Sequence, residues 1–267
     1  ISLTHKLEHL GRNSLTRVAL AHASSWVLPT LHQARSLPSE FQGPCLHTIH
    51  EGIDTTLAYP NPNVSCEVRG IRFDRNEPTL TFINRNLERL RGFDMFMESL
   101  PEIQKHWPNL RVLIVGDNEP GYGFGHSSGR PLREVILQQL KDQIDVDRIH
   151  FLGRIPHPQL IGLLQVSWVH VYLSYPFVLG WSLLEAMACE CAIVGSFGMP
   201  VQEVIDDGVE GLLVPMNDPK DLAKKVCTLL GNPSLRREIG QAARKRALEY
   251  DQTHTLPRLT ALVEKIC

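Results

Sequence analysis

Several features that would place a protein in a special class are scarce in this sequence of 267 residues. No apolar run approaches the roughly 20 residues that a membrane-spanning helix needs. The six cysteines show none of the spacings that bind zinc, and Cys189 and Cys191 lie too close together for a C-x-x-C redox motif. We therefore expect reduced, mostly buried thiols in a cytoplasmic protein with no integral membrane segment. Peripheral association with a membrane is left open.

Charge of one sign is also lacking. The formal net charge of −2 carries no bias toward nucleic acid or a membrane surface, and the basic run RREIGQAARKR at 236–246 spreads around a predicted helix. We therefore expect a solvated helix face and no nucleic-acid partner. Hydrophobic residues make up 43% of the chain and charged residues 21%, which excludes disorder, collagen and coiled coil. An ordinary globular protein of one or two domains remains.

What the sequence does contain, from Thr79 onward, is a regular alternation of short apolar runs and helical periodicity. The runs TLTFIN, LRVLIVG, RIHFLG, WVHVYLS and CAIVGS alternate with helices, of which three are predicted to start after Gly92, Pro131 and Pro156. This order predicts βαβ units in a doubly wound parallel sheet, which is an α/β Rossmann-like fold. From about Asp218 the chain is nearly all helical, and we expect these helices to flank a sheet that is already complete.

The chain is divided by a stretch rich in proline and asparagine. Residues 1–56 predict one or two βα units, too few to close a sheet, so we interpret them as the end of a second, incomplete Rossmann-like domain. The chain begins at Ile1, and we expect it to be a fragment. Residues 57–78 show no clear period and are predicted to be a linker. The complete domain is predicted at 79–250, followed by a C-terminal helix at 251–267.

The loops that follow the strands are the candidate sites, because open α/β sheets bind ligands outside the carboxyl ends of their strands. Arg85, Arg89 and Arg91 follow the first strand of the complete domain, and Gly92 permits close backbone approach just before a helix. Guanidinium groups beside the N-terminal amides of a helix can bind a diphosphate. A charged, surface-exposed turn is the alternative.

Two other loops carry weaker signals. The stretch VGDNEPGYGFGHSSGR holds, after Gly116, four further glycines (Gly121, Gly123, Gly125 and Gly129) without the spacing of a Rossmann fingerprint or a P-loop, so a lid and a plain surface loop both stay open. Gly153 and Arg154 precede a helix, as a strand-end site would. Turn chemistry explains the glycine and the nearby Pro156 and Pro158 without a ligand, so that alternative stays open as well.

The stretch YPFVLGWSLLEAMACECAIVGS, residues 175–196, predicts a short buried helix with a single carboxylate, Glu185, in its first turn. Ser182 and Glu185 fit the S-x-x-E capping box, in which the acid satisfies an amide of its own helix. Alternatively, Gly180 lets a phosphate approach the amides near 182–184, while Glu185 accepts hydrogen bonds from a ribose diol. The pattern alone leaves both hypotheses open.

The segment LLEAMACECAIVGS, followed by MPVQEVIDDGVEGLLVPMNDPKDLAKKV, resembles the family 4 glycosyltransferases. Members of this family combine two Rossmann-like domains in the GT-B fold and transfer sugars from nucleotide donors. Their typical motifs read E-G-F-G-x-x-x-x-E-A-M-A-C-G, then E-V-I-x-D-G-x-N-G-x-L-V and D-P-x-x-L-A. The match runs from about residue 79 to 250 and implies the donor-binding domain of a glycosyltransferase. LHTIHEGIDT looks like the last strand of the acceptor-binding domain.

The resemblance implies a role for each matching position. Arg85 and Arg91 stand where the family holds the donor diphosphate, with one extra residue between them, and Glu185 matches the glutamate that binds the ribose. The remaining implied positions are the phosphate-facing turn at Gly180, Ser182, Leu183 and Leu184, the base-binding edge at Arg154 and Ile155, and the donor-sugar region at Phe177, Val178 and Leu179.

The resemblance also implies a retaining mechanism of carbohydrate biosynthesis that uses neither a metal nor a cofactor. The donor substrate is a nucleotide-diphosphate sugar, and the acceptor is a carbohydrate, a lipid-linked molecule or a small molecule. Arg85 and Arg91 are the implied catalytic residues, because positive side chains stabilise the charge that develops on the leaving diphosphate.

Two positions depart from the family pattern. Phe177 stands where the family has its first glutamate, so a ring replaces a charged acceptor for sugar hydroxyls. Glu190 stands where the family has Gly at a helix end, and if that position is left-handed, Glu costs about 1 kcal/mol. These departures keep two other hypotheses open, namely a nucleotide-binding domain without transfer and a nucleotide-sugar epimerase of the same fold.

Overall fold

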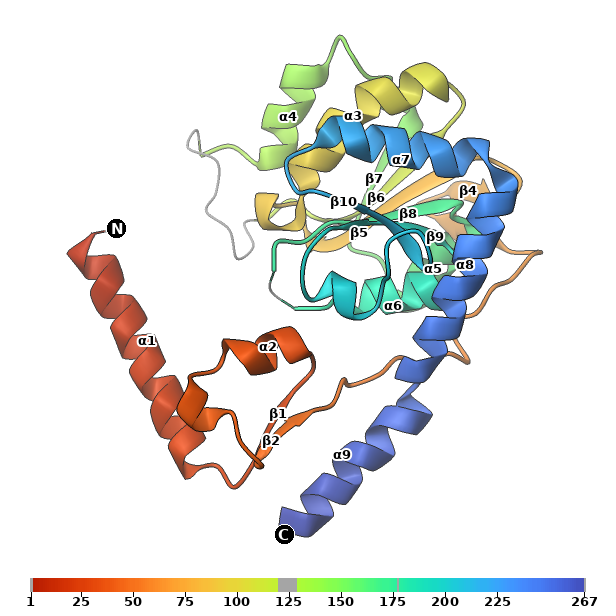
Figure 1. The fold of residues 1–267 in the computed structure, drawn as a ribbon. Coiled ribbons are helices and arrows are strands. Elements are labelled where there is room, and N and C mark those ends of the chain that lie inside the picture. Colours follow the sequence, from red (N-terminus) through yellow and green to blue (C-terminus); the bar gives the residue numbers. More distant parts are fainter. Residues whose placement is uncertain (1, 120–128, 177, 267) are drawn as a thin grey trace.

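A six-stranded parallel sheet forms the centre of the computed structural model, which describes residues 2–119, 129–176 and 178–266 (Figure 1). The strands lie in the order β10-β9-β8-β5-β6-β7, and every adjacent pair is parallel. Their bounds are β5 Thr79–Asn86, β6 Arg111–Asp117, β7 Ile149–Gly153, β8 Val169–Tyr172, β9 Ala192–Ser196 and β10 Gly211–Val214. The predicted α/β Rossmann-like fold is confirmed.

Helices cover both faces of this sheet, as the continuous apolar runs of its strands require. The helices α3 (Phe93–His106), α4 (Leu132–Leu140) and α7 (Pro219–Gly231) contribute to one buried cluster with the strands. The helices α5 (His157–Val166), α6 (Trp181–Ala188) and α8 (Pro233–Ala247) lie against the opposite face (Figure 1). The sheet is therefore doubly wound, and every helix predicted after Gly92, Pro131 and Pro156 is confirmed.

The order of the strands creates one point at which the chain changes direction across the sheet. The chain runs outward through β5, β6 and β7 and then returns to place β8 on the other side of β5. The crevice outside the carboxyl ends of β5 and β8 is the topological switch point, where open α/β sheets bind ligands.

The segment 57–78, predicted to be a linker without a clear period, contains an antiparallel hairpin. Its strands are β3 (Ser65–Val68) and β4 (Ile71–Asp74), and the buried Cys66 and Phe73 belong to the cluster that also holds α5. Each strand has only four residues, so its alternation of buried and exposed positions is too brief to stand out between prolines and asparagines. The domain boundaries themselves stay a prediction.

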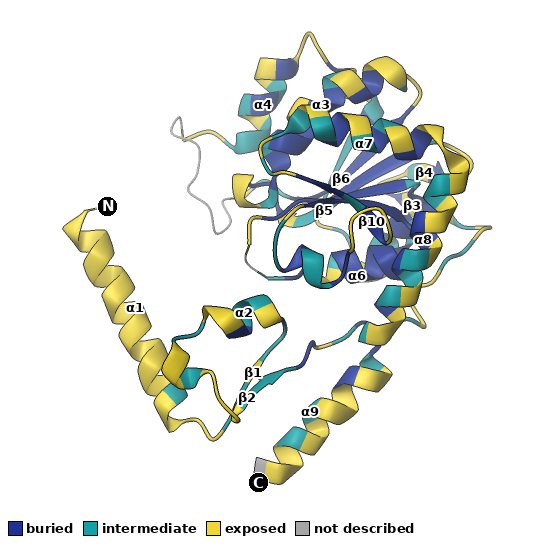
Figure 2. Cartoon of the chain, in the orientation of Figure 1, coloured by how far each residue is buried: buried dark blue, intermediate teal, exposed yellow. Residues whose placement is uncertain are grey.

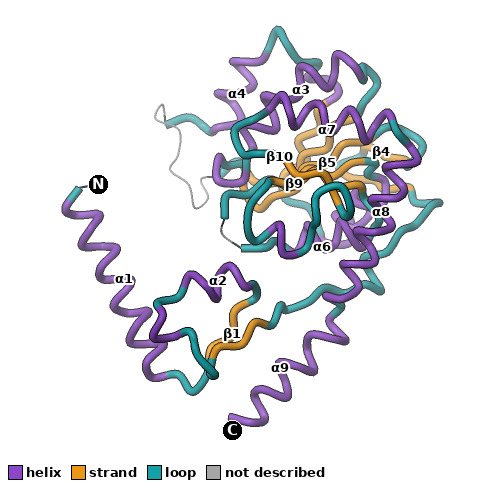
Figure 3. The backbone as a smooth tube through the Cα atoms, in the orientation of Figure 1, coloured by secondary structure: helices purple, strands orange, loops and turns teal. Residues whose placement is uncertain are grey.

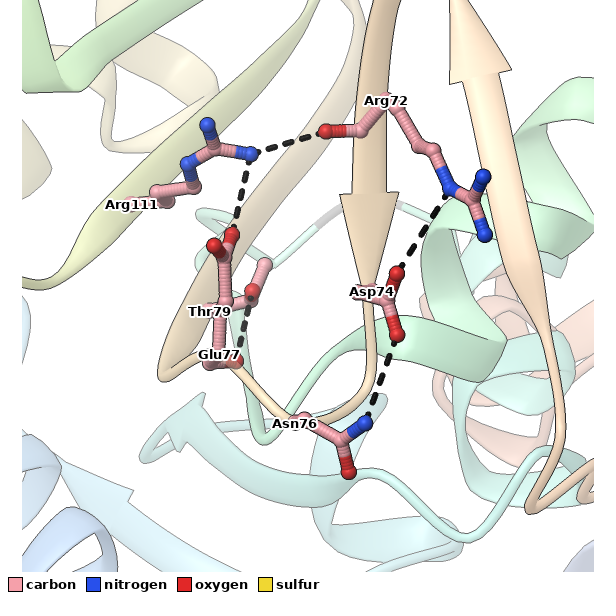
Figure 4. A network of polar contacts seen from close by, with 6 residues as sticks. All are labelled: Arg72, Asp74, Asn76, Glu77, Thr79 and Arg111. Carbon is pink, nitrogen blue, oxygen red and sulfur yellow. Dashed lines mark hydrogen bonds and ion pairs between the residues drawn. The ribbon is translucent and has the colours of Figure 1, made fainter.

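A polar network joins this hairpin to the amino ends of β5 and β6 (Figure 4). Arg111, the first residue of β6, donates from Nη1 to the Arg72 carbonyl oxygen at 2.8 Å and pairs with the Glu77 carboxylate at 3.0 Å. Thr79 Oγ1 donates to the Glu77 carbonyl oxygen at 3.1 Å. The network lies at the amino edge of the sheet, away from the carboxyl ends where ligands bind, so we interpret it as structural.

The N-terminal region, predicted at 1–56 and described from residue 2, contains the elements that the sequence predicts: α1 (Leu3–His22), β1 (Trp26–Leu28), α2 (Leu31–Ser36) and β2 (Leu46–Thr48). β1 and β2 form a two-stranded parallel sheet that is separate from the six-stranded one (Figure 3). Helix α1 has no buried residue (Figure 2). Two strands offer too little surface to bury a helix of this length.

Several contacts among the described residues connect the N-terminal region to the rest of the chain, and two groups of them come from α9 and from Glu203. The last helix, α9 (Gln252–Ile266), returns to it, and the Gln252 amide donates to the Ile53 carbonyl oxygen at 2.9 Å. The Glu203 carboxylate accepts from the backbone amides of Leu31 at 2.8 Å and His32 at 2.7 Å, at the start of α2. No helix in the described part of the chain is long and apolar enough to cross a membrane.

Two local predictions are decided by the fold. The expectation that the sheet is complete before the helices that start near Asp218 is confirmed, but the predicted strands omit the edge strand β10, which follows β9 and pairs with it. The sequence signal is weak, since GLLV has only four residues. The left-handed conformation considered for Glu190 is confirmed, with a φ of 60° directly after the end of α6.

Candidate functional site

A cleft of about 500 Å³ opens at the topological switch point, beside the first turns of α5 and α6. Its described lining residues are Ile83, Asn84, Arg85, Arg91, Val115, Gly116, Arg154, Ile155, His157, Leu160, Tyr172, Gly180, Trp181, Ser182 and Glu185. Seven of the residues predicted for the site therefore meet in one place, although they come from three separate segments of the chain: Arg85, Arg91, Arg154, Ile155, Gly180, Ser182 and Glu185.

Arg91 is the more firmly held of the two arginines predicted to be catalytic. It lies half-buried in the turn between β5 and α3 and donates from Nη1 to Ser174 Oγ at 3.1 Å, beyond the end of β8. Gly92 makes this position possible. It adopts a left-handed φ of 64°, and a Cβ atom there would lie 2.5 Å from Leu173 Cβ. The absence of a side chain at Gly92 thus lets the turn pack against β8 and brings Arg91 to the cleft.

The other two arginines of the cleft are exposed. Arg85 follows Asn84 near the end of β5, and among the described residues its guanidinium group has no hydrogen bond or ion pair. Arg154 pairs through Nε with the Asp117 carboxylate of β6 at 3.0 Å. The described residues that line the cleft therefore include three guanidinium groups and one carboxylate, Glu185, a balance that favours an anionic ligand.

Tyr172 positions the start of α6. Its buried hydroxyl oxygen accepts from the Gly180 amide at 2.8 Å, and a Cβ atom on Gly180 would lie 2.9 Å from that oxygen. Burial raises the pKa of the Tyr172 hydroxyl, so it stays neutral in this position. The Leu183 amide donates back to the Gly180 carbonyl oxygen at 3.1 Å. The end of β8 therefore determines where α6 begins.

The capping hypothesis for Ser182 and Glu185 is wrong. Gly180 is the N-cap residue, Ser182 lies inside the helix, and Glu185 lies in the second turn, where it cannot reach back to a free first-turn amide. Its carboxylate instead accepts a hydrogen bond from His157 Nε2 at 2.7 Å. Glu185 is buried, yet it faces the cleft. The structure thus leaves this acid available to the cleft rather than to its own helix.

Some predicted positions do not line the cleft. The side chains of Leu183 and Leu184 are fully buried in the core, although their implied role concerned backbone amides. Leu179 is buried and Val178 is half-buried just before α6. Phe177, the position that departs from the family pattern, lies outside the described residues, as do residues 120–128 of the glycine-rich loop.

Several residues of the cleft carry no signal in the sequence. His157 stands between Pro156 and Pro158, and nothing in that spacing marks it as a neighbour of Glu185. Trp181 lines the cleft with 57% of its surface exposed, and the buried Nδ2 atom of Asn84 has no hydrogen-bond partner among the described residues. The described residues contain no group of three or more His, Cys, Asp or Glu side chains that could hold a metal ion.

Comparison with known proteins now decides the family. The family model described as glycosyl transferases group 1 matches residues 67–246, which is more than half of the chain and includes the whole cleft. The chain belongs to this family. A second family model, glycosyl transferase family 4 group, matches residues 2–58. The resemblance to family 4 glycosyltransferases seen in the sequence is thereby confirmed.

Curated relatives within the glycosyl transferases are distant. The chain is 28% identical over 190 residues to D-inositol 3-phosphate glycosyltransferase of Corynebacterium jeikeium. This alignment covers 69% of this chain and 43% of that protein. It is 26% identical over 231 residues to alpha-maltose-1-phosphate synthase of Mycolicibacterium smegmatis. This second alignment covers 83% of this chain and 57% of that protein. The chain therefore spans about half the length of these relatives.

Solved structures of glycosyltransferases share the fold. Sucrose-phosphate synthase of Thermosynechococcus elongatus aligns over 96% of this chain and 61% of its own, with a TM-score of 0.77 and 23% identity. HepE of Anabaena, in complex with UDP and glucose, aligns over 95% of this chain and 66% of its own, with a TM-score of 0.76 and 16% identity. At these identities the likeness concerns the fold, which agrees with the six-stranded sheet described above.

Proposed function

We propose that this chain carries the donor site of a glycosyltransferase, which transfers a sugar from a nucleotide-diphosphate sugar to an acceptor with retention and without a metal. The observation that carries the proposal is the meeting of Arg85, Arg91 and Glu185 with the start of α6 in one cleft. Two cationic groups and helix N-terminal amides suit a diphosphate, and a carboxylate with two acceptor oxygens suits a ribose diol.

Each part of the donor would meet a different part of the cleft. Arg85, Arg91 and the amides at the start of α6 would bind the diphosphate, and Glu185 would accept from the ribose hydroxyls. The backbone of Arg154 and Ile155 would face the base. The acceptor, a carbohydrate, lipid-linked or small molecule, would approach from the side of the transferred sugar, near Val178 and Leu179.

Catalysis would follow from the charge that develops on the leaving group. When the bond between the anomeric carbon and the diphosphate oxygen breaks, negative charge accumulates on the diphosphate. Arg91, held by Ser174, and Arg85 would stabilise this charge more strongly in the transition state than in the ground state. The positive end of the α6 dipole would add to the effect.

Calorimetric titration of the chain with UDP, GDP and ADP tests the proposal. UDP comes first, because the fold relative HepE is found in complex with UDP. We expect one nucleotide to bind in the micromolar range, and Glu185→Ala to weaken that binding about tenfold, as expected when a hydrogen bond to a charged group is lost.

A matched control variant separates an effect of Glu185 on nucleotide affinity from the effect of removing any glutamate side chain. Glu102 is an exposed glutamate on α3 that pairs with His106, on the far side of the sheet from the cleft. Glu102→Ala should leave nucleotide affinity unchanged. The proposal fails if the folded chain binds none of the three nucleotides, or if Glu102→Ala and Glu185→Ala weaken binding equally.

A further inference from the structure

The hydrogen bond between His157 and Glu185 joins two side chains with very different surroundings. The distance from Nε2 to Oε1 is 2.7 Å, and the side chains are 53% and 10% exposed respectively. A carboxylate oxygen only accepts, so the imidazole donates from Nε2. Among the described residues, His157 is the one side chain that hydrogen-bonds this carboxylate. A buried acid therefore depends on a single partner at the surface of the cleft.

Stability of the fold does not account for this contact. His157 is the first residue of α5 and Glu185 lies in α6, and these two helices already share an apolar interface that includes Ile161, Leu164 and Leu184. Ion pairs with an exposed partner contribute little to stability, because water screens them. An apolar side chain at position 185 would extend the interface between α5 and α6 and would need no hydrogen-bond partner. The pair is therefore better explained by what it does in the cleft.

The hydrogen bond with His157 uses one of the two oxygens of the Glu185 carboxylate. Oε1 accepts from His157, whereas Oε2 has no partner among the described residues. Glutamate has three side-chain torsion angles. A hydrogen bond to one carboxylate oxygen restricts rotation about the last two of them, χ2 and χ3. His157 itself lines the cleft, next to Ile155 and Leu160. It can thus hold Glu185 from the solvent side without leaving the site.

We infer that His157 is a positioning residue for ribose recognition: it orients the Glu185 carboxylate so that its oxygens meet the vicinal hydroxyls of a nucleoside diphosphate. This inference rests on the proposed function and adds a residue to it. The diol of a ribose presents two donors to one carboxylate, so a carboxylate that is oriented in advance binds it at a lower cost in conformational freedom. His157 therefore acts through Glu185 and contributes to the preference for a ribose that carries both hydroxyls over its 2′,3′-dideoxy form.

The experiment compares two ligands on five proteins. The ligands are the nucleoside diphosphate bound in the titration with UDP, GDP and ADP, and its 2′,3′-dideoxy analogue. The proteins are the wild type, His157→Ala, His157→Gln, Glu185→Ala and the double variant His157→Ala with Glu185→Ala. The quantity measured is the ratio of the two dissociation constants, which reports the diol contact and cancels general effects on the cleft.

We expect the wild type to prefer the ribose form about tenfold or more and Glu185→Ala to lose this preference. His157→Ala should reduce the preference several-fold, whereas His157→Gln, whose amide can also donate to Oε1, should retain most of it. In the double variant the loss of His157 should add nothing, because both changes remove the same contact. A merely structural histidine would lower both affinities together and leave the ratio unchanged.

His106→Ala is the matched control. It removes an exposed imidazole that pairs with the Glu102 carboxylate at 3.4 Å, on α3, and should leave the ratio unchanged. If His157→Ala unfolds below the assay temperature, His157→Leu serves for the same comparison, because leucine fills a similar volume but cannot donate a hydrogen bond to Glu185.

The outcomes separate this inference from the proposed function. If the wild type binds no nucleoside diphosphate, both fail. If the wild type discriminates and Glu185→Ala does not, but His157→Ala keeps the full ratio, only the role of His157 is wrong. A rise in affinity for the ribose form in His157→Ala would also overturn it, because His157 would then compete with the ribose for Glu185.

Discussion

Helices α1 and α3 both carry apolar residues three or four positions apart, but only α3 buries them. In α1, 20 residues long, no residue is buried, whereas eight of the 14 residues of α3 are buried. The difference lies in what each helix can pack against. Helix α3 packs on a six-stranded sheet, whereas β1 and β2, the described strands of the region that contains α1, form a sheet of two strands. An amphipathic pattern therefore predicts which face can be buried, but burial needs a partner surface.

Truncation of one side chain on each helix should show the largest difference between α3 and α1 in unfolding free energy. Phe96 of α3 is fully buried and stacks on Phe82 with ring centroids 4.5 Å apart, so Phe96→Ala should cost about 3–5 kcal/mol of unfolding free energy. Leu7 of α1 is 59% exposed, and Leu7→Ala should change it by less than about 0.5 kcal/mol. Denaturant titration measures both. Equal losses would mean that α1 is buried in solution.

Acid should destabilise the six-stranded sheet through His170. This residue of β8 is fully buried beside Thr81, at 2.9 Å from Nδ1 to Oγ1, and burial lowers its pKa from 6.5 to about 3. Below pH 6.5 the unfolded chain binds a proton that the folded chain does not, so stability falls as the pH falls. The loss should reach about 2 kcal/mol at pH 5.

The measurement is the unfolding free energy between pH 7.5 and 5. His170→Gln, which cannot take up this proton, should flatten the dependence by that amount. An unchanged slope in His170→Gln would show that other groups cause the loss. Because His170 lies in the large sheet and not in the N-terminal region, the effect should appear in probes of the core.

The link between the two regions can be tested at Glu203. Its carboxylate accepts from the Leu31 and His32 amides, and Glu203→Ala removes both contacts, at a cost of about 1–2 kcal/mol to the local stability of α2. Hydrogen exchange of the α2 amides should accelerate accordingly, while the six-stranded sheet stays protected. Gln202→Ala, at the neighbouring position, is the control. Equal acceleration in both variants would mean that this link does not hold the N-terminal region.

The smallest effect is expected at the end of α6. Glu190 has a left-handed φ of 60°, which glycine adopts at little cost, so Glu190→Gly should stabilise the large domain by about 0.5–1 kcal/mol. Glu190→Ala keeps the strain and should bring no such gain. A thermal unfolding series of the three proteins decides the point, and a loss of stability in Glu190→Gly would contradict it.

Much of the site was predictable because of where its residues stand in the sequence. Arg85 lies at the end of β5 rather than after it, and Arg91 and Glu185 follow strands that the apolar runs identify. The carboxyl ends of parallel strands meet at one edge of the sheet. His157 was not predictable, because its contact with Glu185 depends on how α5 and α6 lie side by side. The first residue of α6 is mispredicted by the capping-box motif for a related reason. The S-x-x-E spacing is local, but the hydrogen bond from the Gly180 amide to Tyr172 decides the first residue of the helix.

The alternation of strands and helices, the parallel sheet and the loops that could bear a site follow from the order of the residues, since these features depend on local periodicity and on how chain segments can connect. The packing of the folded chain is needed to see that Glu185 faces the cleft, that His157 is its partner and that α1 is exposed. These outcomes depend on contacts between residues far apart in the chain, and no spacing in a single sequence records such distances.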